Sequence, residues 1–467
     1  QPLFDVGSVA LFVHGIQWIG YTLHFPDWLT IFLAQGLGGG INTVLPLVPQ
    51  IGMMYLFLSF LEDSGYMARA AFVMDRLMQA LGLPGKSFVP LIVGFGCNVP
   101  SVMGARTLDA PRERLMTIMM APFMSCGARL AIFAVFAAAF FGQNGALAVF
   151  SLYMLGIVMA VLTGLMLKYT IMRGEATPFV MELPVYHVPH VKSLIIQTWQ
   201  RLKGFVLRAG KVIIIVSIFL SAFNSFSLSG KIVDNINDSA LASVSRVITP
   251  VFKPIGVHED NWQATVGLFT GAMAKEVVVG TLNTLYTAEN IQDEEFNPAE
   301  FNLGEELFSA VDETWQSLKD TFSLSVLMNP IEASKGDGEM GTGAMGVMDQ
   351  KFGSAAAAYS YLIFVLLYVP CISVMGAIAR ESSRGWMGFS ILWGLNIAYS
   401  LATLFYQVAS YSQHPTYSLV CILAVILFNI VVIGLLRRAR SRVDIELLAT
   451  RKSVSSCCAA STTGDCH

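Results

Sequence analysis

Charged residues are scarce in this chain, and their scarcity excludes an ordinary soluble globular domain. Only 13% of the 467 residues are Asp, Glu, Lys or Arg, whereas 54% are hydrophobic, and the mean hydropathy is +0.61. Soluble domains carry about 25% charged residues. A basic excess is missing as well, because the net charge is −3, so no nucleic-acid partner is expected. The composition instead predicts a protein embedded among membrane lipids.

The sequence also lacks a regular cysteine pattern. Its seven cysteines have neither the even number nor the spacing of a disulfide framework, so free thiols are expected. A signal-peptide pattern is missing, and the chain begins with Gln1, which suggests a fragment of a longer protein. The cysteines in or beside apolar segments are Cys97, Cys126, Cys371 and Cys421, and those of the polar tail are Cys457, Cys458 and Cys466.

Long apolar runs are present, and they predict an all-α polytopic membrane protein. A helix needs about 20 apolar residues to cross a bilayer. Residues 9–35 are amphipathic and are expected at the membrane interface. Residues 264–285 are less apolar, and we expect them either to re-enter the membrane or to pair with a weak crossing near 320–331. The predicted spans are 41–61, 115–141, 147–168, 212–228, 356–378, 386–408 and 417–436.

The distribution of Lys and Arg orients these spans. Segments on one side hold 21 of the 29 basic residues, and segments on the other side hold six. Basic loops stay in the cytoplasm, so the tail beginning at Arg437 is expected inside the cell. The segment 286–352, with 14 Asp and Glu against three Lys, is then outside. It would concentrate cations at an entrance, although a merely solvated loop is the more ordinary explanation.

Two parts of the chain repeat a similar order of elements. Gly82–Pro84 leads to Gly94–Cys97 in the first part, and Pro254–Gly256 leads to Gly267–Gly271 in the second. The preceding spans cross in opposite directions by the charge count, which predicts an inverted repeat with a site near the middle of the membrane. Chance similarity between apolar segments is the alternative. The expected units are an interfacial segment (1–40), a first module (41–141), a connecting span and loop (142–211), a second module (212–378), C-terminal spans (379–436) and a tail (437–467).

The segment 94–101 interrupts the apolar sequence of the first module. Glycine, proline and a polar Asn are poorly suited to a helix in lipid, and backbone exposed at that depth needs cover by protein or water. Together with the metal-capable thiol of Cys97, they predict part of a permeation or binding site. A structural turn with a buried Cys is the alternative. The residues that break the helix are Gly94, Gly96, Asn98 and Pro100.

A proline interrupts a later apolar segment in each module. Pro122 removes a backbone donor and frees the carbonyl of Ile118. Pro370 does the same for Leu366. Such carbonyls bind a cation if they face a cavity, whereas neighbours satisfy them in an ordinary kink. Recurrence in both modules favours a site, whose further candidate residues are Ser125, Cys126, Cys371 and Ser373.

Lys275 and Glu276 lie inside an apolar run of the second module. An ionised side chain at the bilayer centre costs on the order of 3 kcal/mol. Adjacent side chains on a helix point in different directions, so each charge needs another partner, and Arg129 is the candidate for Glu276. Participation in ion passage and structural ion pairing are both open.

The chemistry of these groups favours a cation as cargo. Thiolates, carboxylates and freed carbonyls bind cations, and cysteines together with 22 Met favour a transition metal over Na⁺ or K⁺. Most of the Met residues are ordinary core residues. Thiolates alone prefer copper(I) or zinc, so selectivity for iron does not follow from ligand type.

Several long motifs resemble the bacterial ferrous iron transport protein B family, in the right order and over nearly the whole chain. The resemblance implies two inverted gate modules and uptake of ferrous iron, as the transported substrate, across the bacterial inner membrane. It also implies that Cys97, Cys126 and Cys371 handle the metal, that Glu276 is the acidic residue of the second gate, and that Asn98 supplies an oxygen ligand or shapes a gate. The motifs are Gly65–Phe72, Gly82–Ser87, Gly94–Pro100 and Met273–Glu276, with the Pro122/Cys126 and Pro370/Cys371 elements.

The chain departs from the family pattern at its N-terminal side. Family members carry a GTP-binding domain and a first span that have no counterpart in these 467 residues. Gly82–Ser87 resembles a phosphate loop, but Ala80 stands where the motif requires its first Gly. We therefore do not expect this chain to be an enzyme, and GTP and Mg²⁺ would act only through the GTP-binding domain. The implied partners are that domain, small cytoplasmic accessory proteins and further copies of the chain.

Two other functions stay open. A secondary symporter of an organic solute such as a nucleoside also uses gate-type modules, but Asn, Gln and aromatic residues are scarce around the breaks. A structural or signalling membrane protein would lose no cation flux when the gate cysteines are changed. The tail is a candidate cytoplasmic metal acceptor, or a disordered end, because its residues bind metals but lack finger-like spacing. These residues are Cys457, Cys458, Cys466 and His467.

Overall fold

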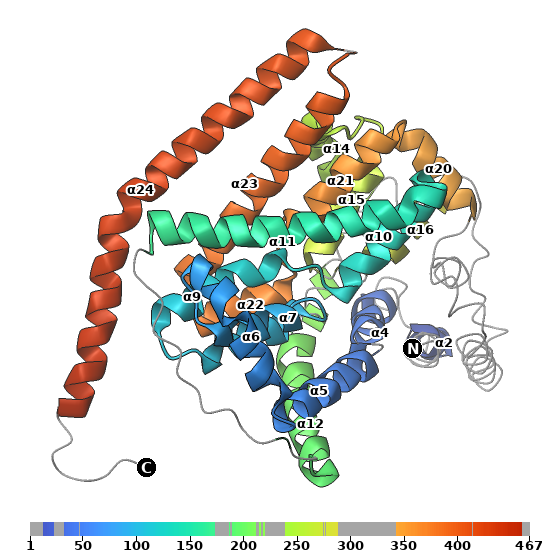
Figure 1. Cartoon of the computed structure of the whole chain (residues 1–467). Helices are drawn as coiled ribbons and strands as arrows, with labels where there is room; N and C mark the ends of the chain where they lie inside the picture. The colour runs from blue at the N-terminus through green and yellow to red at the C-terminus, as the bar shows by residue number, and fades with distance from the viewer. Residues whose placement is uncertain are drawn as a thin grey trace.

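The computed structural model is built of helices, and no strand occurs among the residues that it describes. This part of the chain is drawn in colour in Figure 1. The described residues are 13–22, 32–45, 47–172, 186, 189–211, 214–215, 218–219, 239–273, 275, 277–287, 342–412 and 414–459.

Five stretches are long and apolar enough to cross a membrane, and they coincide with five of the predicted spans. This confirms an all-α polytopic membrane protein. The predicted span 41–61 overlaps α4 (Gly39–Val44) and α5 (Leu47–Asp63). Most of 212–228 lies outside the described residues, as does part of the interfacial segment. The five stretches are 111–140, 142–170, 355–381, 384–409 and 415–438.

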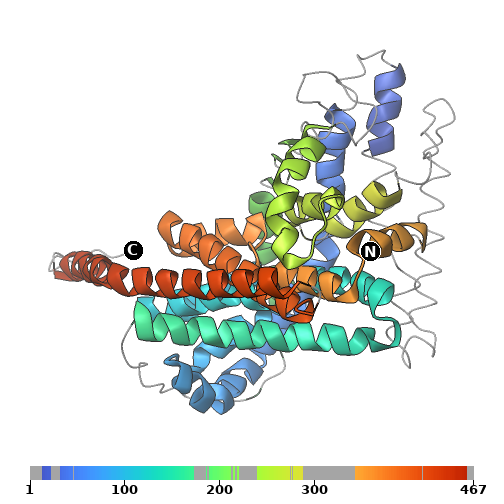
Figure 2. The ribbon, with the colours of Figure 1, turned by 90° about the horizontal axis from the view of Figure 1, so that it is seen from above.

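Three long helices cross the molecule at different angles. In Figure 1, α11 (Gly145–Thr170) lies across the middle, whereas α24 (Pro415–Ala459) lies along the outer side and is steeply inclined to α11. α23 (Arg384–Ala409) leads the opposite way to α24, and Figure 2 shows α11 and α24 from above. A helix of 26 residues is about 39 Å long, which exceeds the hydrocarbon thickness of about 30 Å. Each of these helices is therefore long enough for one complete crossing.

The first module is a series of short helices. Glycines in the left-handed conformation stand before and after α6, with φ of 80° at Gly65 and 78° at Gly82, a region that other residues rarely adopt. The later segment 111–140 is divided at Pro122, because proline lacks an N–H and clashes with the preceding turn. The elements are α5, α6 (Tyr66–Leu81), η3 (Gly85–Ser87), α7 (Phe88–Val93), α8 (Asn98–Gly104), η4 (Ala105–Thr107), α9 (Pro111–Met120), η5 (Ala121–Phe123) and α10 (Gly127–Phe140).

Residues 264–285 form a helical hairpin rather than a single crossing. α15 (Trp262–Met273) and α16 (Val277–Thr287) run antiparallel. A Cβ atom added at Gly267 would lie 3.0 Å from Leu282 Cδ2, and one added at Gly271 would lie 2.7 Å from Val278 Cγ2. This pairing folds the segment back on itself, in agreement with the re-entrant alternative of the prediction.

The second half contains a further broken helix pair. α21 (Ala355–Leu367) and α22 (Ile372–Glu381) are separated by an extended stretch that includes Pro370. Each half therefore has one short broken pair followed by a longer one. The orientation of the two modules and their exact boundaries stay predictions. The remaining elements of the chain are α2 (Gly15–Thr22), η2 (Phe32–Gly38), η6 (Gly142–Asn144), α12 (Val191–Phe205), η7 (Val206–Gly210), α14 (Ala240–Ile248), η9 (Thr249–Ile255) and α20 (Thr342–Phe352).

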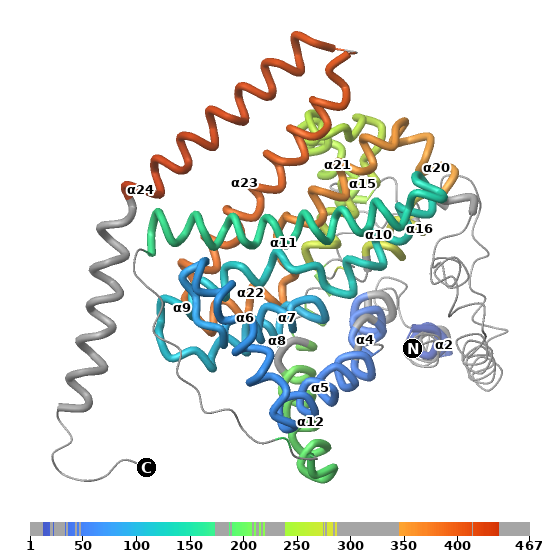
Figure 3. Tube along the Cα trace, in the orientation of Figure 1, coloured from blue at the N-terminus to red at the C-terminus, as the bar shows by residue number. Residues whose placement is uncertain are grey.

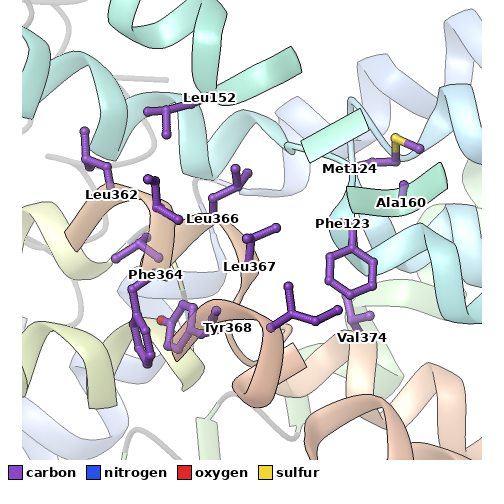
Figure 4. Close-up of a cluster of buried hydrophobic side chains, with 14 of the residues drawn as sticks. Phe123, Met124, Leu152, Ala160, Leu362, Phe364, Leu366, Leu367, Tyr368 and Val374 are labelled. Carbon is purple, nitrogen blue, oxygen red and sulfur yellow. The ribbon is translucent and has the colours of Figure 1, made fainter. Parts of the chain in front are cut away.

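One continuous apolar core joins the two longer broken pairs to α11. Figure 4 shows side chains of this core, with Phe123 and Met124 from the break between α9 and α10 and Tyr368 from the break between α21 and α22. Small residues let α11 approach closely, because a Cβ atom at Gly156 would lie only 2.9 Å from the carbonyl oxygen of Phe123. The core thus fixes the two breaks relative to each other.

The last span is attached to its neighbour by a polar network. Asn429 of α24 accepts a hydrogen bond from Asn396 at 3.1 Å and donates one to Ser400 Oγ at 2.8 Å. The most apolar part of 415–438 contains no buried residue. This helix therefore turns its apolar side chains toward the surroundings, as a lipid-facing helix does.

Candidate functional site

Each of the three predicted metal cysteines immediately precedes a helix. Cys97 precedes α8, Cys126 precedes α10 and Cys371 precedes α22. All three carry reduced thiols and are half-buried. A helix N-terminus carries a partial positive charge that favours an anionic group beside it. Each cysteine follows a helix break in the sequence. Because a new helix starts after each break, each thiol lies at a helix N-terminus.

The first break, at residues 94–97, depends on glycine. A Cβ atom at Gly94 would lie 2.9 Å from the carbonyl oxygen of Leu91 and 3.0 Å from Met124 Cβ. The carbonyl oxygen of Gly96 accepts a hydrogen bond from the backbone N–H of Gly127 at 3.3 Å. Backbone atoms of the first break are therefore in direct contact with the next broken helix.

Asn98 joins the same two breaks through its side chain. It is 4% exposed. With its amide nitrogen directed at the surrounding carbonyls, it donates hydrogen bonds to Gly94 at 2.9 Å and Ala121 at 3.2 Å. The opposite amide orientation leaves one longer hydrogen bond, to Met124 at 3.3 Å, and satisfies fewer buried groups. Asn98 thus links the two breaks of the first module, and its role in a gate stays a prediction.

Arg129 occupies the second break of the first module. Its side chain is fully buried, and Nη1 donates to the carbonyl oxygens of Pro122 and Met124, both at 2.9 Å. These carbonyls follow the proline, whereas the prediction singled out Ile118 before it. The expected partner Glu276 lies outside the described residues, so this pairing stays a prediction.

Arg129 also connects the first module to the second. Its guanidinium lies within electrostatic range of the Cys126 and Cys371 thiols and of the Tyr153 and Tyr368 hydroxyls. Cys126 and Cys371 thus share one buried cation, although they are distant in the sequence. The two longer broken pairs meet at this point.

Tyr368 lies in the break between α21 and α22 and contacts the re-entrant hairpin. Its hydroxyl is close to Gly271, where a Cβ atom would come within 2.5 Å of that oxygen. Its ring packs against Phe364, with 5.5 Å between the centroids (Figure 4). Lys275, at the turn of the hairpin, is 3% exposed and places Nζ 4.9 Å from the centre of the Tyr368 ring, a cation–π distance.

The helices that follow Cys97 and Cys371 pack against each other, and α8 and α22 appear together in Figure 3. An ion cluster joins their ends. Glu381 accepts from Arg106 Nε at 2.6 Å and from Arg114 Nη2 at 2.8 Å, and Arg106 Nη2 makes a further contact. The hydrogen bond with the carboxylate raises the pKa of Arg106. Sequence reasoning missed this cluster, because nothing near Glu381 indicates partners 267 and 275 positions away.

The described residues do not form a ready-made metal cage. In this part of the chain, no three His, Cys, Asp or Glu side chains lie close enough together to hold one metal ion. The three predicted cysteines thus do not come together in one such group. Cys457 and Cys458 belong to α24, but their side chains are not described. Cys466, His467 and Glu276 lie outside the described residues.

Two known protein families match parts of the chain that include the broken helices. The Gate family, described as "Nucleoside recognition", matches residues 44–140 and 206–384. A second family, "Ferrous iron transport protein B C terminus", matches residues 149–201. Fold and comparison together define a helical membrane protein of the Gate class. Within that class, the chain belongs to the ferrous iron transport protein B family.

Curated relatives agree with this assignment. The chain is 99% identical over 467 residues to a protein of Shigella flexneri named Fe(2+) transporter FeoB, and 94% identical over 467 residues to one of that name from Salmonella typhimurium. A Legionella pneumophila protein of the same name is 48% identical over 448 residues, which cover 94% of this chain and 58% of the relative. The chain spans 60% of the length of the first two relatives. No solved structure matches.

Proposed function

We propose that this chain forms the membrane route by which ferrous iron enters the bacterial cytoplasm. The observation that carries the proposal is the meeting of the two longer broken pairs in one apolar core, with Cys126 and Cys371 each at the start of the helix that follows its break. Helix breaks that meet inside a membrane protein are the usual place of an ion site. The name Fe(2+) transporter FeoB, given to the relatives, supports Fe²⁺ as the ion.

Cys97, Cys126 and Cys371 act in this proposal as transient ligands. Passage requires binding that is strong enough for entry and weak enough for release. Single thiols at successive breaks suit such a transfer better than a closed cage of four ligands, which holds structural metals. Glu276 adds an oxygen ligand at the second gate. The tail cysteines and His467 form a candidate acceptor on the cytoplasmic side.

The orientation of the protein in the membrane follows from the distribution of basic residues. The proposal places the protein in the bacterial inner membrane, with the Lys- and Arg-rich segments and the C-terminus in the cytoplasm. A GTP-binding domain ahead of this chain then lies on the same side and controls passage. This chain acts as the transport region and not as an enzyme, and GTP and Mg²⁺ act through that domain. Accessory proteins and further copies of the chain are additional partners.

The test is anaerobic uptake of Fe²⁺ into proteoliposomes that contain the full-length protein. The variants Cys97→Ser, Cys126→Ser and Cys371→Ser, and separately Glu276→Gln, are compared with the wild type. Cys421→Ser is the matched control, because this thiol is half-buried on α24. We expect each gate variant to reduce Fe²⁺ uptake and the control to retain it. Equal Fe²⁺ uptake in all variants would show that these residues are not ligands of the transported ion.

The description of the Gate family favours one second candidate, a nucleoside symporter. Labelled nucleoside is therefore offered to the same vesicles. Nucleoside flux without Fe²⁺ flux would establish the symporter and refute iron transport. Fe²⁺ flux without nucleoside flux would exclude the symporter.

A further inference from the structure

The side chain of Arg129 fills the position at which the first module exposes backbone carbonyls. Nη1 lies 2.9 Å from the carbonyl oxygens of both Pro122 and Met124, and the residue is 0% exposed. Carbonyl oxygens released at helix breaks are cation ligands in channels and transporters. In this conformation, the guanidinium of Arg129 occupies these oxygens in place of a transported ion.

The guanidinium is only partly satisfied at this position. Within the described part of the chain, Nε and Nη2 of Arg129 have no hydrogen-bond acceptor. A guanidinium has five N–H donors, and burial of a charge is costly unless an anion and further hydrogen bonds compensate it. Two carbonyls supply only part of that compensation. Arg129 therefore differs from a fully paired structural arginine.

The position within the helix is also unfavourable for a positive charge. Arg129 lies in the first turn of α10, which begins at Gly127. The helix dipole places a partial positive charge at that end, so a cation there is disfavoured. Helix stability does not explain an arginine at this position.

Arg129 interacts electrostatically with both proposed thiol ligands of the two longer broken pairs. Both Cys126 and Cys371 are within electrostatic range of its guanidinium. A divalent cation that moves between these thiols approaches a fixed positive charge with little solvent to screen it. The guanidinium and the ion cannot occupy the Pro122 and Met124 carbonyls at the same time.

We propose that Arg129 is an internal cation gate, which closes the route by occupying these carbonyls and which a transported ion must displace. This inference rests on the proposed function and names the residue that controls passage at the same site. Lys275, which is 3% exposed beside Tyr368, adds a second positive charge to the region. The closed route is thereby protected against leakage of small cations.

The competing explanation is that Arg129 only stabilises the break through its hydrogen bonds. A variant that removes the charge but retains hydrogen bonding distinguishes the two explanations. Arg129→Gln retains N–H donors but has no charge, and Arg129→Met removes both. Arg384→Met is the matched control, because Arg384 is an exposed arginine at the start of α23.

The experiment measures passive, nucleotide-free influx of Fe²⁺ and of Mn²⁺ into proteoliposomes containing the full-length protein. We expect influx in Arg129→Gln to rise about tenfold or more over the wild type, because one unit of repelling charge is lost in a poorly screened site. Arg384→Met should remain at the wild-type level. Arg129→Met should leak at least as fast as Arg129→Gln, and its influx is the substitute readout if Arg129→Gln does not fold.

Two outcomes overturn the gate. Influx at the wild-type level in a folded Arg129→Gln or Arg129→Met variant would show that the charge does not close the route. A leak in Arg129→Met with none in Arg129→Gln would assign the closure to the hydrogen bonds alone. The proposed function is judged separately by GTP-dependent Fe²⁺ uptake of the wild type. A leak in Arg129→Gln without that uptake would retain the gate and refute iron transport.

Discussion

Glu381 and Arg114, which are 267 positions apart, form an ion pair with 2.8 Å between Oε2 and Nη2. Arg106 contacts the same carboxylate. The Glu381 side chain is only 2% exposed, whereas those of Arg114 and Arg106 are 33% and 54% exposed. The carboxylate at the end of α22 is therefore the buried member of the cluster, and it links the end of this helix to the first module.

The first prediction concerns this carboxylate. Glu381→Gln should lower the free energy of unfolding by about 1–3 kcal/mol, because two guanidinium groups lose a charged acceptor but can still reach water. Glu259→Gln is the control, since Glu259 pairs with Lys253 where both side chains are 61% exposed. Such exposed pairs contribute less than about 1 kcal/mol. Thermal unfolding in detergent is the measurement, and equal shifts of the two variants would contradict a buried anchor.

The second prediction concerns the close approach of α11 to the first module. Gly156→Ala should destabilise the protein by about 1–3 kcal/mol, because its Cβ would lie 2.9 Å from the Phe123 carbonyl oxygen and the backbone cannot yield as a side chain can. Gly434→Ala is the matched helix control, with open space at the added Cβ. Alanine favours the helix, so the control should be neutral or slightly stabilising. A Gly156→Ala variant as stable as the control would disprove the tight packing.

The sequence predicts the spans and the breaks well, because both follow from local chemistry. A run of apolar residues crosses a membrane whatever its neighbours are, and Pro122 interrupts its helix because a donor is missing. The re-entrant course of 264–285 was one of two alternatives until the pairing of Gly271 with Val278 decided it.

Contacts between distant segments were beyond sequence reasoning. The carbonyls held by Arg129 follow Pro122, and only the folded break determines which oxygens face the guanidinium. Glu381 appears as an ordinary charge at the end of an apolar span. Its two arginine partners become visible only when α8, α9 and α22 are placed together.

The third prediction concerns the side chain that links the two breaks of the first module. Asn98→Leu should lower the free energy of unfolding by about 1–3 kcal/mol, because the buried carbonyls of Gly94 and Ala121 lose their donor. Asn144→Leu is the control at an exposed asparagine. Amide hydrogen exchange should also accelerate in residues 94–97 of the variant. Unchanged exchange there would show that Asn98 does not hold the break.

The last prediction tests the contact between the re-entrant hairpin and the break between α21 and α22. Gly271→Ala should destabilise the protein, since the new Cβ would lie 2.5 Å from the Tyr368 hydroxyl oxygen and 2.7 Å from Val278 Cγ2. Tyr368→Phe removes the hydroxyl but leaves the ring that Lys275 faces. The loss in Gly271→Ala should therefore be smaller when Phe already replaces Tyr368.

A double-mutant cycle measures this coupling. Contacting residues typically give interaction energies of about 0.5–3 kcal/mol, so we expect about 1 kcal/mol or more for this pair. Gly280→Ala is the control in the second helix of the hairpin, because space is open at its Cβ, and its effect should be independent of Tyr368→Phe. If the stability changes of Gly271→Ala and Tyr368→Phe are strictly additive, the hairpin and the break between α21 and α22 are not in contact through this pair. Coupling confined to Gly271 would place the turn with Lys275 directly against the break that holds Cys371, where a change in the position of the hairpin can be transmitted to the proposed ion route.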